Sequence, residues 1–148
     1  MKKALLCIGN EIRGDDGVAI VVGRLVEENL PEWKVFFGYD EPEDEMESLK
    51  EFNPDVIVVI DAISGSVEGE IDFLDLSEKN TYVYRTHDIP NPTLLNSIRD
   101  ICGKTIFIGI CVLLENVLHF TEGLSDNAKK YTIDAFDRIK DLDVKIDK

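Results

Sequence analysis

Histidine, cysteine and long apolar runs are all scarce in this sequence. It holds two histidines and three cysteines in 148 residues. No apolar stretch approaches the roughly 18 to 20 residues that a membrane-spanning helix requires. The apolar run near the N-terminus is broken by Gly9 and Asn10 before it reaches the length of a signal-peptide core. We therefore expect a cytoplasmic protein with no membrane segment and no secretory leader.

The few cysteines and basic residues exclude further classes. Cys7, Cys102 and Cys111 lack the short spacing of a zinc knuckle, so we expect buried, reduced thiols. Lys and Arg total 16 against 30 Asp and Glu, which gives a net charge of −14. Nucleic acids and anionic membranes bind clustered basic residues. A cationic or metal-bearing partner fits this charge better.

Length and composition indicate one globular domain over residues 1–148. Hydrophobic residues make up 44% of the chain and charged residues 31%, without a tail or linker of biased composition. A chain of this length buries enough apolar surface to fold without metal or disulfide support.

Apolar patterning predicts strands that alternate with helices. Strand-like apolar runs are expected at residues 4–8, 34–37, 56–60, 69–76, 81–85 and 105–111. Amphipathic helices are expected at residues 15–30, 46–52, 94–101 and 124–142, the last with Ser125 as a possible N-cap. This alternation predicts an α/β fold, a three-layer α/β/α sandwich with a mostly parallel twisted sheet of about five strands.

Functional groups of such sheets gather at the C-terminal ends of the strands. The first of these loops, residues 9–16, contains glycines, but Gly9, Gly14 and Gly17 lack the dinucleotide-binding spacing. Asp15 and Asp16 would also repel a phosphate at that helix start. Either one can cap the helix, and we assign Asp15 to the cap and Asp16 to the crevice.

Two later strand ends supply further candidates. Asp61 follows five apolar strand residues, so its carboxylate needs a partner to offset desolvation, although it could simply cap the next loop. His87 follows another predicted strand, whereas His119 lies in a polar segment without a comparable setting. Asp16, Asp61 and His87 together form a set that can bind a borderline divalent cation such as nickel.

Five segments carry a resemblance to one family: LLCIGNEIRGDDGVA, NPDVIVVIDAIS, YRTHDIP, KTIFIGI and GLS. With these motifs the sequence resembles the maturation endopeptidases of nickel-iron hydrogenases over nearly the whole chain. The resemblance implies a protease that removes the C-terminal extension of the hydrogenase large-subunit precursor after nickel has been inserted. It also implies that Asp16, Asp61 and His87 contact this nickel, which the substrate presents, with no organic cofactor.

The sequence departs from the family pattern at three places. Ala19 replaces a glycine after the DDG element, GYDEPEDE replaces an Asp-Gly-Gly or Asp-Gly-Thr element after the second strand, and GICVLLENV lacks the usual proline after the late strand. The last two departures border the expected cleft, so they bear on substrate identity more than on reaction class.

The residues also indicate a mechanism. Ser64 and Ser66 have no assigned base, and Cys7 lies inside a strand, so an acyl-enzyme is disfavoured. We expect water to attack the scissile amide directly, with a carboxylate as base and with metal or His87 offsetting the oxyanion charge. Two alternatives are a metallopeptidase of broader specificity that keeps its own metal and a non-catalytic chaperone that checks nickel loading.

Overall fold

The computed structural model describes residues 1–64, 67–77, 92–118 and 120–147. Its core is a five-stranded sheet of order β2-β1-β3-β5-β4, in which β4 is antiparallel to β5 and the other neighbours pair in parallel. The strands are β1 (Lys3–Ile8), β2 (Trp33–Tyr39), β3 (Val56–Ile63), β4 (Ile71–Asp75) and β5 (Thr105–Cys111). The strand expected at residues 81–85 lies outside the described residues.

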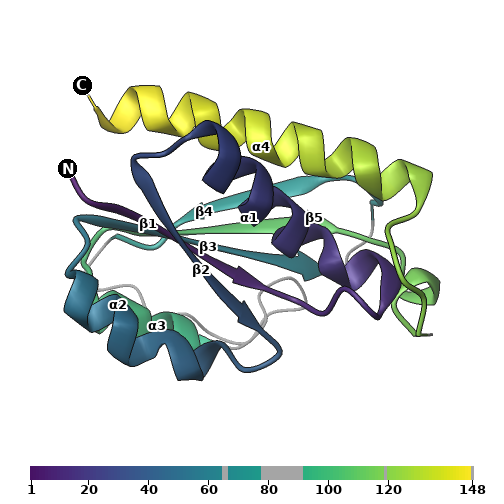
Figure 1. Ribbon diagram of the computed structural model, residues 1–148, viewed down its shortest axis with the longest axis horizontal. Helices are drawn as coiled ribbons and strands as arrows, with labels where there is room; N and C mark the ends of the chain where they lie inside the picture. Colours follow the sequence, from purple (N-terminus) through teal and green to yellow (C-terminus); the bar gives the residue numbers. More distant parts are fainter. Residues whose placement is uncertain (65–66, 78–91, 119, 148) are drawn as a thin grey trace.

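Helices cover both faces of this sheet, as Figure 1 shows. One face carries α1 (Val18–Asn29) and α4 (Asp126–Ile146), and the other carries α2 (Met46–Phe52) and α3 (Pro92–Ile101). Short 3-10 helices, η1 (Gly14–Gly17), η2 (Pro42–Glu45) and η3 (Leu114–Asn116), lie in the connections. The predicted three-layer sandwich with a mostly parallel sheet is confirmed.

The central strands are apolar along their length because they are covered on both sides. Side chains of β3 alternate between the two layers: Val58 and Ile60 pack in the α1 and α4 layer, whereas Ile57 and Val59 pack in the α2 and α3 layer. Asp61 continues the second series, so its side chain belongs to the face that carries α2 and α3.

The predicted cap of the last helix is also confirmed. Ser125 precedes α4, and its Oγ accepts a hydrogen bond of 3.2 Å from the backbone N–H of Ala128. Ala135 and Ile139 lie on the buried stripe of this helix. Oγ of Ser125 also donates a hydrogen bond of 2.8 Å to Oδ2 of Asp15, so α4 begins at the same end of the sheet as the loop that follows β1.

The strand order predicts a ligand-binding crevice at one end of the sheet. The chain runs from β1 to β2 on one side and then to β3 on the other, so the order reverses at β1. Ligands of open α/β sheets bind outside the carboxyl ends of the strands at such a reversal.

Two expectations from composition can be compared with this structure. Cys7, Cys102 and Cys111 are all buried and form no disulfide among the described residues, as expected. Within the described ranges, no helix has the length and apolar character needed to cross a lipid bilayer.

Candidate active site

Carboxylates from three strand ends converge at the crevice. Asp61 belongs to the last part of β3, Asp16 to the loop after β1, and Asp40 directly follows β2. They lie close enough that the charges of Asp16 and Asp40 both raise the pKa of Asp61. The structure therefore brings together two of the residues predicted from the sequence and adds a third.

Asp61 is the most deeply placed of the three, with 8% of its surface exposed. Burial is the main cause that raises the pKa of its carboxyl well above the ordinary value, and the negative charges of Asp16 and Asp40 add to it. The backbone N–H of Ala62 donates a hydrogen bond that opposes this shift only in part. Binding of a proton or a cation would therefore offset the unfavourable negative charge of Asp61.

Asp16 is half-buried and is fixed by the loop that precedes it. The backbone N–H of Asn10 donates a hydrogen bond of 2.8 Å to Oδ2 of Asp16. Burial raises the pKa of Asp16, and the charge of Asp40 raises it further, while the Asn10 hydrogen bond and the charge of Arg13 lower it. Asp16 thus lies close enough to Asp61 for its charge to act on that carboxyl.

Asp40 is exposed and was absent from the predicted set. The side-chain amide of Asn10 donates a hydrogen bond of 2.9 Å to its Oδ2. The rule that functional groups follow strands pointed to this loop, but the loop holds several acidic residues and nothing in the sequence singled out Asp40.

The prediction that Asp15 caps the first helix is wrong. Its carboxylate is 1% exposed and accepts two hydrogen bonds of 2.8 Å from Ser125, one from the backbone N–H and one from Oγ. The helix expected from residue 15 begins instead as η1, and α1 starts at Val18 without a side-chain cap. Asp15 serves as a tie between the first loop and the start of α4.

Gly9 allows the close packing of the first loop. Its φ is +144°, a conformation that side-chain-bearing residues rarely adopt, and a Cβ there would lie 2.1 Å from the backbone oxygen of Asp16. Its N–H donates a hydrogen bond of 3.0 Å to the carbonyl of Tyr39. Gly9 therefore joins the loop after β1 to the end of β2.

Both histidines, His87 and His119, lie outside the described residues, so the predicted imidazole stays a prediction. Within the part of the chain that the structure describes, no group of three His, Cys, Asp or Glu side chains is arranged to hold a metal ion alone.

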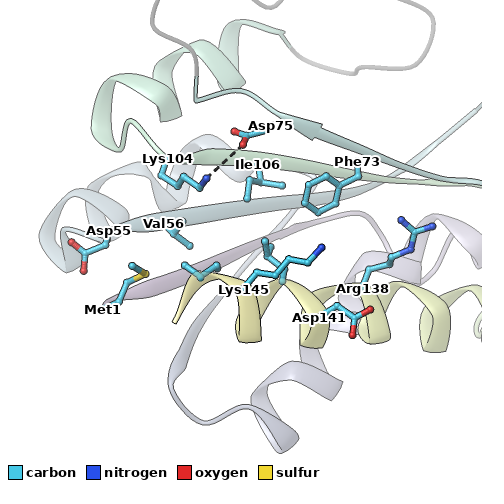
Figure 2. Close-up of a pocket in the computed structure, with 12 residues that line it drawn as sticks. Met1, Asp55, Val56, Phe73, Asp75, Lys104, Ile106, Arg138, Asp141 and Lys145 are labelled. Carbon is cyan, nitrogen blue, oxygen red and sulfur yellow. Dashed lines mark ion pairs between the residues drawn. The ribbon is translucent and has the colours of Figure 1, made fainter. Parts of the chain in front are cut away.

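The structure also has a cavity of about 860 Å³ at the opposite end of the sheet. Figure 2 shows it between the sheet and α4, where Lys104 pairs with Asp75 at 3.5 Å. Its charged residues are of both signs and are near the amino ends of the parallel strands. We place the active site at the carboxylates, because perturbed acidic groups mark chemistry better than volume does.

Known proteins with similar chains include hydrogenase maturation proteases. No protein-family model matches the sequence. The hydrogenase 3 maturation protease of Escherichia coli K12 is 29% identical over 113 residues, which cover 74% of this chain and 72% of that protein.

Solved structures extend the likeness to nearly the whole chain. An uncharacterized protein from Wolinella succinogenes is 60% identical, with a TM-score of 0.89 and 99% coverage of both chains. The solution structure of the endopeptidase HycI from Escherichia coli has a TM-score of 0.77 at 25% identity and covers 97% of this chain and 92% of that one.

The α/β fold and the relatives with similar sequences, which are named maturation proteases and endopeptidases, make this chain a peptide hydrolase. It is similar to the hydrogenase maturation proteases over most of its length.

Proposed function

We propose that this endopeptidase removes the C-terminal extension of a nickel-iron hydrogenase large-subunit precursor once nickel is in place. The named relatives are hydrogenase maturation proteases, which supports the substrate class. The observation that carries the proposal is the repulsion between buried Asp61 and half-buried Asp16 at the carboxyl ends of the strands.

Like charges held together in a partly desolvated crevice make the empty site electrostatically unfavourable. A divalent cation at the crevice would offset both carboxylates and lower their pKa values. Nickel presented by the precursor supplies such a charge, so a loaded precursor binds more tightly than an unloaded one. The protease thereby reads the metal content of its substrate.

We assign His87 as the third group that contacts this nickel. It precedes α3 by five residues, and α3 leads into β5 through a three-residue connection. Because a helix between parallel strands runs back along the sheet, Pro92 at its start faces the end that carries Asp61. This direction of α3 supports a place for His87 near the two carboxylates, and imidazole is a suitable ligand for nickel.

Cleavage then proceeds by attack of water on the scissile amide. One carboxylate of the site, that of Asp16 or that of Asp61, accepts the proton from that water. His87 or the substrate's nickel offsets the charge on the oxyanion. Release of the peptide completes one cut.

The test is the intact mass of a precursor incubated with the purified protein. We expect one cleavage of the nickel-loaded precursor and none of the nickel-free precursor. Cleavage of both forms, abolished when the protease alone is treated with chelator, would favour the metallopeptidase that keeps its own metal. Nickel-dependent binding without any cut would favour the chaperone.

A further inference from the structure

Four large apolar side chains are exposed beside the proposed active site. They are Ile12, Leu114, Leu118 and Phe120, with 53%, 58%, 63% and 76% of their surfaces exposed. We call them the apolar rim. A soluble protein leaves single apolar side chains exposed, but a group of them next to a site marks an interaction surface.

Two segments far apart in the sequence are joined to form this rim. The backbone N–H of Thr121 donates a hydrogen bond of 2.9 Å to the carbonyl of Ile12, and that of Gly14 donates one of 2.8 Å to the carbonyl of Thr121. The guanidinium of Arg13 lies 5.4 Å from the centre of the Phe120 ring. These contacts hold the rim to the first loop.

The rim is joined to the loop that carries Asp16. Ile12 belongs to the same loop as Asn10 and Asp16, whose hydrogen bond fixes one side of the crevice. The other segment follows β5, in which Gly109 is in register with Asp61. In Figure 1 this segment lies beyond the arrowheads of β3 and β5, at the end of the sheet where α1 begins. A polypeptide bound at the carboxylates therefore has the rim beside it.

The net charge of the protein favours an apolar contact at the rim over a contact with another acidic surface. The protein carries a net charge of −14, which disfavours broad contact with another acidic surface. The rim offers apolar contacts and the cation Arg13 at the edge of an acidic crevice. Such a surface supplies affinity without adding repulsion.

We infer that the apolar rim docks an apolar segment of the hydrogenase large-subunit precursor, beside the segment that enters the crevice. This inference rests on the proposed function and adds a second point of contact to it. A contact away from the scissile bond stabilises the bound substrate and the transition state equally. Loss of the rim contact therefore raises KM and leaves kcat unchanged.

The test compares Leu118→Ser and Phe120→Ser with Val144→Ser as control. Val144 is an exposed apolar residue of α4, 60% exposed, and lies outside the rim. The measured quantities are kcat and KM for cleavage of the nickel-loaded precursor encoded in the same genome, and the Kd of that precursor by biolayer interferometry. We expect each rim variant to raise KM and Kd about tenfold with kcat unchanged, and Val144→Ser to resemble the wild type.

Each outcome separates the two proposals. If the wild type cleaves and the rim variants keep its KM, the rim inference fails and the proposed function stands. If the wild type binds without cleaving and the rim variants bind more weakly, the proposed function fails and the rim stands. If the wild type neither binds nor cleaves the precursor, both proposals fail. If the wild type is a dimer that Phe120→Ser converts to a monomer without a change in KM, the rim is a self-association surface and the rim inference fails.

Discussion

Asn10 holds Asp16 in place through its backbone N–H, which donates a hydrogen bond of 2.8 Å to Oδ2 of that carboxylate. The side-chain amide of the same Asn10 binds Asp40. One residue thus donates hydrogen bonds to two acidic groups of the proposed site. The resulting concentration of negative charge has consequences for stability as well as for catalysis.

The buried carboxyl of Asp61 should make stability depend on pH in a defined direction. Its folded-state pKa is raised, chiefly by burial, above the roughly 3.9 of an unfolded chain. Between these two values the folded state binds more protons than the unfolded state, so stability falls as pH rises through this window.

Asp61→Asn removes this penalty while keeping a side-chain oxygen. We expect the variant to exceed the wild type in Tm by ~2–4 °C at pH 7, the shift that ~1 kcal/mol gives for a domain of this size. The difference should shrink as pH falls toward 4. Thermal unfolding followed by circular dichroism at several pH values measures it, and a variant less stable than the wild type at pH 7 would contradict the assignment.

Gly9 should resist substitution because of both its conformation and its surroundings. Gly9→Ala places a Cβ 2.1 Å from the backbone oxygen of Asp16, so the loop must shift and carry Asp16 with it. We expect a loss of cleavage of roughly a hundredfold or more and a lower Tm. Gly103→Ala is the matched control, since no atom lies within 4 Å of its Cβ position. Equal activity of the two variants would show that the loop tolerates the shift.

We expect the side chain of Asp15 to stabilise the folded protein. Asp15→Ala removes the acceptors of two hydrogen bonds from Ser125, and the loss of a buried partner costs about 1–3 kcal/mol in free energy of unfolding. Asp15→Asn keeps one oxygen and should cost less. Urea denaturation measures the free energy of unfolding of both variants. A loss within ~0.5 kcal/mol for Asp15→Ala would mean that the hydrogen bonds between Asp15 and Ser125 contribute little to stability.

A buried ion pair should stabilise the opposite end of the molecule. Lys3, on β1, lies 2.6 Å from Asp143 and 2.8 Å from Asp147, with its own side chain 3% exposed. Lys3→Met should reduce the free energy of unfolding by roughly 1–3 kcal/mol, because Asp143 loses its cation in a poorly hydrated place.

Lys129→Met supplies the comparison, since its partner Asp126 is exposed and 3.7 Å away. We expect a change within ~0.5 kcal/mol there. Both variants should keep the wild-type kcat at temperatures well below their Tm. A Lys3→Met protein as stable as Lys129→Met would show that the buried pair contributes nothing net.

The sequence predicts the fold well because the spacing of apolar residues follows directly from which side chains of a strand or helix are buried. β5 has the predicted bounds, and α4 is capped at Ser125 as expected. The site is predicted less completely. Asp61 stands out in the sequence because it interrupts an apolar run. Asp40 is one acid among several in an exposed loop, and only the structure shows its hydrogen bond from Asn10.

The assignment of Asp15 shows a second limit of sequence reasoning. A carboxylate at a predicted helix start satisfies the rule for a cap, and nothing local distinguishes a cap from a tertiary bond. The partner, Ser125, is 110 residues away. Only the packing of α4 against the first loop brings the two together, and Asp16 is left to face the crevice.

The most direct test of the central claim is the single-turnover rate at which Asp16→Asn and Asp61→Asn cleave the nickel-loaded precursor. Each substitution keeps the shape and removes one charge of the proposed site, and circular dichroism checks that the variants are folded. We predict that both rates fall by a factor of at least about 10². Folded variants that cleave at the wild-type rate would contradict the account.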